Sequence, residues 1–597
     1  MYGYSGKALL VRLDKKRAEP IDLKENLAAR LIGGRGFGAF FLNKFVPEKI
    51  DPYASENALI LASGSLNNTR TPLASKLGFF FKSPLTGIFG ESYVGGSIPR
   101  FPKAVGYDVI IIVGKAEKPT YLVVGDGSVE FRNASDLWGK TTVETDDELR
   151  KEWGKKASVA CIGPAGENLV RFACINVDKW RQAGRCGGGA VMGSKKLKAI
   201  VFVGEKTTEP ANGETFKELL DEVLSRIAKS KGVKGMRKYG TPSMAALANE
   251  MGFFPTMYWS RGNLEGWENI GPEAIRSILK HPHPCWNCPI ACGRYVKVRT
   301  KWGEIEMDGP EYETIFALGG LFGLSNLEGL VYLNYLADAL GLDTITLGNV
   351  LGFAVEASKR DLLDIKIGYG DVDSAIELIK QIVERKGAGA VLSEGVAIAS
   401  KKIGLENLAV HVKGLEPAGY DPRMLRGMSI AYAISPRGAC HLRAMAYIID
   451  IRKLAGDPTE LNEEKVKKII EFEDWMTSFD SLIICKFGRD IFDIELMWKL
   501  YVAVTGFKID LREYRRSLRR ILMLIRFFNE REGLSREDDS LPERFFVEPL
   551  RTKSGEYFLD RDQFKRALDK YYELRGFTRD GKLRSEDRQE IREILST

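Results

Sequence analysis

The sequence predicts an α+β protein of several domains, in which a β-sheet region at the N-terminal end precedes mainly α-helical domains. Three observations support this prediction. At 597 residues the chain is too long for one hydrophobic core, so two to four domains of about 100 to 200 residues each are expected. Residues 1–203 contain short β-branched runs separated by turn signals, and from residue 214 onward the apolar residues follow the period of helices.

The predicted strands lie in the first third of the chain. Their spacing is not a regular alternation with helices, so one large mixed or antiparallel sheet is expected rather than a doubly wound parallel sheet. A polar stretch, residues 204–213, predicts a linker after the last strand. The runs are Leu9–Leu13, Leu59–Leu61, Leu77–Phe81, Val109–Val113, Tyr121–Val124, Val159–Ile162 and Ile200–Val203.

The helical region begins with an apolar stripe, and two of its later helices have informative ends. One helix, residues 329–340, is expected to end at Gly341, because glycine suits a left-handed C-cap. Another is expected to begin after Asn462, a good N-cap, and to reach Asp480 and Cys485. The stripe consists of Phe216, Leu219, Leu220, Val223 and Ile227.

The two helix ends share a pattern. Residues 338–343 and residues 480–485 both start with an aspartate, continue with four mostly apolar residues, and finish with an acid or a thiol. Two matching ends could hold a ligand between them, since carboxylates accept hydrogen bonds from ring N–H groups. Two ordinary helix C-termini with surface aspartates are the alternative interpretation.

A cysteine motif, Cys285-x2-Cys288-x3-Cys292, predicts one bound metal centre in a chain that has only eight cysteines. A soft metal or an iron–sulfur cluster accepts several thiolates from one loop. A multi-histidine site is hard to build, because the chain has four histidines. A fourth ligand must come from elsewhere, and the candidates are Cys161, Cys174, Cys186, Cys440 and Cys485.

Charge and hydropathy narrow the classes of partner. The net charge is +8, and the excess is spread along the chain, so no nucleic-acid partner is expected. The same net charge is equally compatible with a basic surface patch that binds an acidic electron carrier. The N-terminus does not resemble a signal peptide, and no run reaches the roughly 18 apolar residues of a membrane span. We therefore expect a cytoplasmic protein, no membrane partner, and reduced cysteines available to a metal.

Three other interpretations of the cysteines are weaker. Enzymes that form radicals from S-adenosylmethionine carry the reverse spacing, x3 before x2. A zinc module would make the motif structural and the protein a scaffold without redox activity. Cys440 beside His441 could be a nucleophile, but no nicotinamide-binding β-α-β unit with a downstream acid accompanies the pair.

The chain resembles the aldehyde:ferredoxin oxidoreductase family over essentially its whole length. The resemblance depends on the cysteine motif, both aspartate helix ends and further ordered motifs. These are Gly33-Gly34-Arg35-Gly36, Lys82-Ser83-Pro84-Leu85-Thr86-Gly87, Ile162-Gly163-Pro164-Ala165-Gly166-Glu167-Asn168, Ala183-Gly184-Arg185, Gly193-Ser194-Lys195, Gly309-Pro310-Glu311-Tyr312-Glu313 and Tyr420-Asp421-Pro422-Arg423.

The resemblance implies the architecture and the chemistry. A β-rich domain over residues 1–210 would cover the cofactor, and helical domains over 211–415 and 416–597 would each supply one aspartate motif. The implied cofactors are a tungsten (or molybdenum) bis-pyranopterin, one 4Fe–4S cluster and a magnesium ion bridging the pterin phosphates. The implied reaction is aldehyde oxidation to a carboxylic acid, with electrons passing to ferredoxin or to an iron–sulfur partner subunit. Reduction of activated carboxylate or aromatic acyl compounds within a larger complex is the alternative within the family.

The resemblance also implies residue roles. Glu313 and His441 would be catalytic, with Tyr312 and Arg443 lining the pocket. The cluster ligands would be Cys285, Cys288, Cys292 and Cys485. The cofactor-binding residues would be Lys76, Tyr93, Gly95, Gly96, Ala183, Gly184, Arg185, Asp338, Leu342, Asp343, Asp480, Ile484 and Cys485.

Three positions depart from the family pattern. Lys76 stands where an arginine often links cluster and pterin, and it keeps the charge but loses the planar fork. Tyr93 stands where asparagine is frequent. The Glu-x-x-His pair that holds a metal at a subunit interface is replaced by residues 332–335, Tyr-Leu-Asn-Tyr. A metal-bridged homodimer is therefore not expected, and the oligomeric state stays open.

Overall fold

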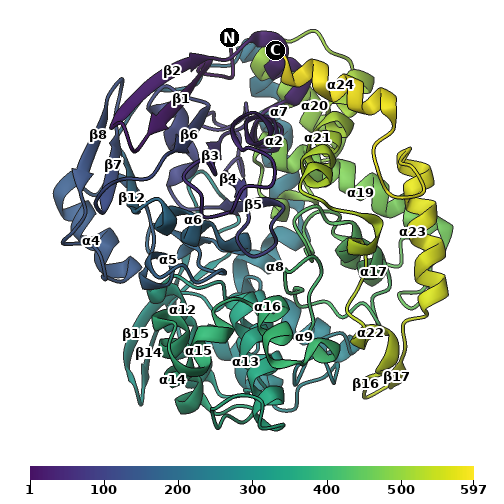
Figure 1. Ribbon diagram of the computed structural model, residues 1–597. Coiled ribbons are helices and arrows are strands. Elements are labelled where there is room, and N and C mark those ends of the chain that lie inside the picture. Colours follow the sequence, from purple (N-terminus) through teal and green to yellow (C-terminus); the bar gives the residue numbers. More distant parts are fainter.

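Two six-stranded mixed sheets form the N-terminal part of the computed structural model, which describes residues 1–597 (Figure 1). The first has the order β2-β1-β6-β3-β4-β5, and the second has the order β11-β10-β9-β12-β7-β8. The first consists of β1 (Lys7–Arg12), β2 (Arg17–Asp22), β3 (Leu59–Ala62), β4 (Leu77–Lys82), β5 (Phe89–Val94) and β6 (Val109–Val113). The second consists of β7 (Thr120–Val124), β8 (Val129–Asn133), β9 (Ser158–Cys161), β10 (Ile175–Val177), β11 (Arg181–Ala183) and β12 (Leu197–Phe202).

The mixed character that the sequence predicted is confirmed, but the prediction of one large sheet is wrong. β1 runs parallel to β6 and β12 runs parallel to β7, while the remaining pairs are antiparallel. Twisted open sheets rarely exceed about ten strands without splitting, which explains why the strands divide into two sheets. Helices also interrupt this region, including α2 (Gly34–Phe45), which contacts β3 and β4.

A small antiparallel sheet within the helical region was not predicted. It has the order β13-β14-β15, with β13 at Leu279–His283, β14 at Gly293–Thr300 and β15 at Gly303–Asp308. His283 pairs with Gly293 where β13 ends and β14 begins. The predicted cysteine motif therefore occupies the loop that joins two paired strands, which fixes both ends of the motif.

The long helices confirm the predicted helical region. The apolar stripe lies on α7 (Gly213–Lys229), and its residues Phe216, Leu219, Val223 and Ile227 are buried. α19 (Glu463–Leu482) contacts α2, α21 (Leu511–Arg531) and α23 (Arg561–Arg575). Figure 1 shows α19, α21 and α23 in the right half of the molecule. No helix combines the length and the apolar character that a membrane span requires.

One hydrophobic cluster of 173 buried residues extends through the first sheet and both helical parts of the chain. Such a continuous core resists movement of the sheets relative to the helices, because close-packed side chains transmit strain. Any cavity between these parts is therefore held by a rigid frame. The domain boundaries at residues 210 and 415 stay a prediction.

A buried charge network links the first sheet to the helices. Arg35 of α2, fully buried, donates two hydrogen bonds to the Glu91 carboxylate of β5, at 3.0 and 2.9 Å. Arg443 lies 2.9 Å from the same carboxylate, and the Tyr93 hydroxyl donates to it at 2.7 Å. Burial by itself would raise the pKa of Glu91, but Arg35 and Arg443 outweigh it and hold that pKa below its usual range.

Replacing Glu91 by alanine is expected to destabilise the protein by about 3–5 kcal/mol, because the Arg35 guanidinium stays buried without its carboxylate. Urea or thermal unfolding measures the loss. Glu130 provides a control, since it pairs with the exposed Arg132 on β8, and Glu130→Ala is expected to leave the unfolding midpoint nearly unchanged. Equal midpoints for the two variants would contradict the role of the network.

Candidate functional site

A cavity of about 370 Å³ lies between the sheets and the helices, and its wall brings together predicted residues from all parts of the chain. Two predicted residues are not in the wall. The Gly96 carbonyl accepts a hydrogen bond from the Trp286 N–H at 2.9 Å, and Ala183 is the buried last residue of β11. The wall contains Lys76, Tyr93, Gly95, Gly184, Arg185, Cys285, Cys288, Cys292, Glu313, Asp338, Leu342, Asp343, His441, Asp480, Ile484 and Cys485.

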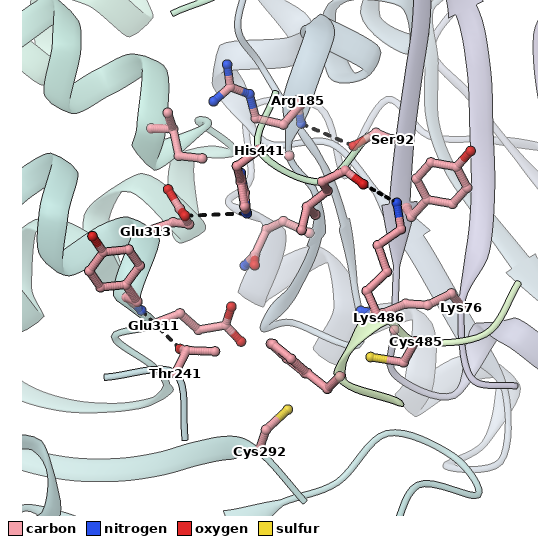
Figure 2. Close-up of a pocket in the computed structure, with 18 of the residues that line it drawn as sticks. Lys76, Ser92, Arg185, Thr241, Cys292, Glu311, Glu313, His441, Cys485 and Lys486 are labelled. Carbon is pink, nitrogen blue, oxygen red and sulfur yellow. Dashed lines mark hydrogen bonds and ion pairs between the residues drawn. The ribbon is translucent and has the colours of Figure 1, made fainter. Parts of the chain in front are cut away.

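The cysteine loop, residues 285–292, meets Cys485 at one end of this cavity. Leu73 holds them together, because its N–H donates to the Asn287 carbonyl at 3.2 Å and its carbonyl accepts from the Cys485 N–H at 2.8 Å. Figure 2 shows Cys292 and Cys485 on opposite sides of this end of the cavity. These backbone hydrogen bonds hold the cysteine loop and Cys485 next to one another.

The surroundings of the four cysteines are positively charged and closely packed. Partial burial would lower the pKa of Lys76, but the nearby thiols of Cys485, Cys285 and Cys292 outweigh it and raise that pKa. A Cβ added to Gly95 would stand 2.5 Å from the Cys285 Sγ and 3.4 Å from the Lys76 Nζ. Gly95 therefore leaves room that a side chain would fill.

All four cysteine side chains, Cys285, Cys288, Cys292 and Cys485, line the same cavity. Together they can supply the four thiolates that an iron–sulfur cluster requires.

The two aspartate helix ends adopt the same backbone geometry. α12 (Leu327–Leu340) is followed by Gly341 at φ 82°, and α19 is followed by Ile483 at φ 60°. Asp338 and Asp480 each lie three residues before that left-handed residue, and both line the cavity. Isoleucine costs about 1–2 kcal/mol in this conformation, so the surrounding structure must hold Ile483 there.

The charges at the two ends differ. Asp338 accepts a hydrogen bond from the Asn334 amide at 3.1 Å, and burial raises its pKa well above the usual range. Asp480 instead faces two cations, since Lys486 Nζ and Arg443 Nη1 each lie 2.9 Å from its carboxylate. Asp480 takes part in two ion pairs and Asp338 in none, so the two ends offer different surroundings to a ligand.

Arg185 connects the N-terminal sheets to the first aspartate motif. Its backbone N–H donates to the Ser92 hydroxyl at 3.1 Å (Figure 2), and its Nη2 donates to the Glu416 carbonyl at 2.6 Å. Its Nε lies 3.2 Å from the carboxylate of Asp343, which is the N-cap of α13 (Thr344–Ser358). A fixed guanidinium beside the glycine-containing segment 183–185 suits binding of an anionic group.

Glu313 and His441 face one another across the cavity (Figure 2). The Glu313 Oε1 lies 3.4 Å from the His441 Nε2, and its Oε2 accepts from the Gly419 N–H at 3.1 Å. Burial raises the pKa of Glu313 to about 8. Burial, assisted by Arg437, lowers the pKa of His441 well below its usual range. Near neutral pH the carboxyl therefore holds a proton and the imidazole is neutral, an arrangement suited to proton transfer.

Two residues of the wall, Arg437 and Tyr420, were not predicted as site residues. The Arg437 Nη2 donates to the Cys440 Sγ at 2.9 Å, and Tyr420 stacks on the His441 ring with centroids 5.3 Å apart. Burial would raise the pKa of Cys440, but Arg437 and Arg443 lower it to about 7. The only sequence signal for Arg437 was its position three residues before Cys440, whereas Arg443 was expected to line the pocket and does so.

The cavity wall also carries buried polar atoms that make no hydrogen bond within the chain. In native proteins nearly all buried polar atoms are hydrogen-bonded, so their concentration around one cavity indicates a polar ligand. Their nitrogen atoms suit acceptors such as phosphate or ring oxygens. The atoms concerned are the side-chain nitrogen of Gln182 and the Nε atoms of Arg181, Arg437, Arg443 and Arg489.

Comparison with known proteins agrees with this site. Residues 8–204 match the family model "Aldehyde ferredoxin oxidoreductase, N-terminal domain", and residues 218–592 match "Aldehyde ferredoxin oxidoreductase, domains 2 & 3". A tungsten-containing aldehyde ferredoxin oxidoreductase of Pyrococcus horikoshii is 37% identical over 609 residues, covering 99% of both chains. Its namesake from Pyrococcus furiosus is 36% identical over 606 residues, again covering 99% of both chains.

A solved structure shares the fold. The active-site complex BamBC of benzoyl coenzyme A reductase aligns with a TM-score of 0.86 at 24% identity, covering 100% of this chain and 98% of that chain. At this identity the likeness concerns the fold alone. The family models and the full-length relatives confirm the resemblance that the motifs indicated. The chain belongs to the aldehyde ferredoxin oxidoreductase family.

Proposed function

We propose that this protein oxidises aldehydes to carboxylic acids with a tungsten (or molybdenum) bis-pyranopterin cofactor. The electrons would leave through one 4Fe–4S cluster to ferredoxin or to an iron–sulfur partner subunit. The observation that carries the proposal is the cavity itself, which joins four cysteines, two matching aspartate helix ends and unpaired polar atoms in one wall. The relatives named tungsten-containing aldehyde ferredoxin oxidoreductases support it over the full length.

The cluster would be held by Cys285, Cys288, Cys292 and Cys485. All four line the same cavity, which supports a cluster that they share. Lys76 beside them supplies positive charge that favours thiolates.

Replacing Gly95 by alanine is expected to lower the iron content, because the new Cβ would stand 2.5 Å from the Cys285 Sγ and displace it. Iron and labile sulfide per chain measure the effect, and we expect an iron affinity lowered at least about tenfold. Gly213→Ala is the control, since no atom lies within 4 Å of its added Cβ. Full iron content in the Gly95 variant would contradict the expectation that cluster binding requires a residue without a side chain beside the Cys285 Sγ.

The pterins would be held at the two aspartate helix ends. Asp338 and Asp480 would bind ring nitrogen atoms, with Leu342, Asp343 and Ile484 nearby. Segments 93–96 and 183–185 would receive the phosphates and a bridging magnesium ion, because glycine backbone lets N–H groups approach phosphate oxygens closely. The unpaired nitrogen atoms of Gln182 and Arg437 support this assignment.

The protein's part in the reaction is proton transfer and orientation. Oxidation adds the oxygen of one water molecule to the aldehyde carbon and releases two electrons and two protons; when bound, the metal centre and the cluster supply the redox chemistry. Glu313, once ionised, would accept a proton from that water molecule, and His441, 3.4 Å away, would exchange protons with it. The aromatic stack of His441 on Tyr420 keeps the imidazole in place.

Metal analysis of anaerobically purified protein, combined with a panel of aldehydes and a viologen dye, tests the proposal. We expect tungsten or molybdenum together with iron and labile sulfide, and dye reduction that depends on aldehyde. Protein produced with adequate metal supply that contains neither tungsten nor molybdenum would contradict the proposed function. Zinc in place of iron would contradict the assignment of the cysteines.

A further inference from the structure

A short exposed helix beside the cysteine loop carries an unusual excess of positive charge. α8 (Lys231–Tyr239) contains no acidic residue, and its exposed basic residues form no ion pair with any carboxylate of the chain. Some exposed lysines on other helices are paired within their own helix, as in Lys467 with Glu463 at 3.0 Å and Lys499 with Glu495 at 2.7 Å, whereas α8 has no carboxylate to offer. The unpaired residues of α8 are Lys231, Lys234, Arg237 and Lys238.

The charges of α8 lie mainly on one face. Residues 231, 234 and 238 follow the i, i+3, i+7 spacing that places side chains on a single stripe of a helix. Val233 is buried and Met236 lines the cavity, so the opposite face packs inward. The lysine stripe is therefore directed to solvent, where it can meet another molecule.

The inner face and the end of α8 pack on the cysteine loop. The Arg237 Nη2 donates to the Pro289 carbonyl at 2.6 Å. Arg294 joins the two segments, because it donates to the Cys292 carbonyl and to the Arg237 carbonyl, each at 3.0 Å. A Cβ added to Gly240, just after α8, would stand 2.8 Å from the Cys292 carbonyl oxygen. The positive stripe is thus attached to the loop that carries three of the predicted cluster ligands.

A further unpaired cation lies where the other side of the loop is anchored. Arg70 is exposed and pairs with no carboxylate, and it precedes Thr71, whose carbonyl accepts from the Asn287 side chain at 2.9 Å. Within the loop Cys288 is half-buried, whereas Cys485 is buried. The loop is therefore the side on which the predicted cluster comes nearest to solvent, and unpaired positive charges flank it.

We propose that α8 and Arg70 form the docking surface for an acidic iron–sulfur electron carrier, which extends the proposed function by assigning its partner a place on the molecule. An acidic protein would neutralise the unpaired cations of this surface, and docking there would bring its redox centre close to the cysteine loop. Complementary charge accelerates association and orients the encounter, and salt weakens both effects.

The double variant Lys234→Glu/Lys238→Glu, prepared as the holoenzyme, tests this docking surface. With an acidic ferredoxin at low ionic strength, kcat/KM for ferredoxin is expected to fall at least about tenfold, and the loss is expected to shrink as salt is added. Aldehyde oxidation with benzyl viologen is expected to stay at the unaltered protein's rate, because neither lysine lines the cavity.

Lys401→Glu/Lys402→Glu provides a matched control with the same change of charge. These lysines are exposed near the end of another helix, α16 (Val396–Ile403), and belong to no ion pair. An equal loss of ferredoxin reduction in both double variants, or no loss in the α8 variant, would overturn the proposal that α8 and Arg70 bind the electron carrier.

Direct binding separates this inference from the proposed function. Calorimetric titration of oxidised ferredoxin into each holoenzyme is expected to show binding that the α8 variant loses and the α16 variant keeps. This binding result would support the docking surface even if the protein oxidised no aldehyde. Absence of aldehyde oxidation would contradict only the proposed function. An α8 variant that loses affinity for a single-stranded oligonucleotide but keeps its affinity for ferredoxin would assign the surface to nucleic acid and overturn the proposal.

Discussion

Replacing Cys485 by serine is expected to remove most of the iron and labile sulfide from the protein while leaving the fold intact. A serine hydroxyl is a poor cluster ligand, whereas the backbone N–H at position 485 keeps its hydrogen bond to the Leu73 carbonyl. Changes in the surroundings of a metal ligand typically cost 10–100-fold in affinity or activity, so loss of a ligand itself is expected to lower aldehyde oxidation by more than about a hundredfold. Iron analysis, visible absorbance and a dye assay measure these effects.

Cys161 provides the matched control. It is buried in β9 within the second sheet, and it does not line the cavity. Cys161→Ser introduces the same chemical change away from the site, so the iron content and the absorbance are expected to be kept. If the Cys485 variant keeps its full iron content, Cys485 is not the fourth ligand. The role would then belong to one of the other candidate cysteines, of which Cys440 is the one that lines the cavity.

Features set by local sequence were predictable. Gly341 ends α12 in the left-handed conformation, and the Asn462 side chain accepts from the Lys465 N–H at 2.9 Å at the start of α19. These ends depend on a few neighbouring residues, so capping rules apply to them directly. The same reasoning explains why the matching positions of Asp338 and Asp480 could be recognised before their surroundings were known.

Features set by distant contacts were not predictable from sequence patterns alone. Glu91 meets Arg35 across 56 residues and the Arg437 guanidinium across 346 residues, and neither separation leaves a local pattern. Buried arginines resemble surface cations in a sequence, because only tertiary packing decides their burial. For the same reason the division into two sheets and the strands around the cysteine loop depended on pairing between distant segments.

The choice of Cys485 as the fourth ligand shows how sequence and three-dimensional structure complement one another. Spacing alone left five candidate cysteines, and the family resemblance selected one. The structure gives a physical reason for its position, since Leu73 is hydrogen-bonded both to the cysteine loop and to Cys485. The ligand role itself stays a prediction that metal analysis must test.

Replacing Glu313 by glutamine is expected to lower kcat/KM for aldehydes by about 10²–10⁴-fold, the usual contribution of a general acid or base. Glutamine keeps the size of the side chain and can still accept from the Gly419 N–H, but it cannot take up a proton. Metal and iron contents are expected to match the unaltered protein, because Glu313 is predicted to bind neither. Dye reduction with saturating and limiting aldehyde measures the loss.

The dependence on pH distinguishes a proton acceptor from a group that only positions the substrate. Burial raises the pKa of Glu313 to about 8, so the reactive carboxylate is scarce below that pH and dominates above it. In the unaltered protein kcat/KM is therefore expected to rise about tenfold per pH unit up to about pH 8 and then to level off. The Glu313→Gln variant should lose this rise.

Glu311→Gln serves as the comparison, since it makes the same substitution two residues away, at a side chain that also lines the cavity but is exposed, and it should keep the rise. If the Glu313 variant keeps the rise as well, the group that titrates lies elsewhere in the wall. Burial holds the pKa of His441 well below its usual range, so its imidazole is already neutral throughout this interval and cannot produce the rise. Cys440, with a pKa lowered to about 7, would then be the next group to replace.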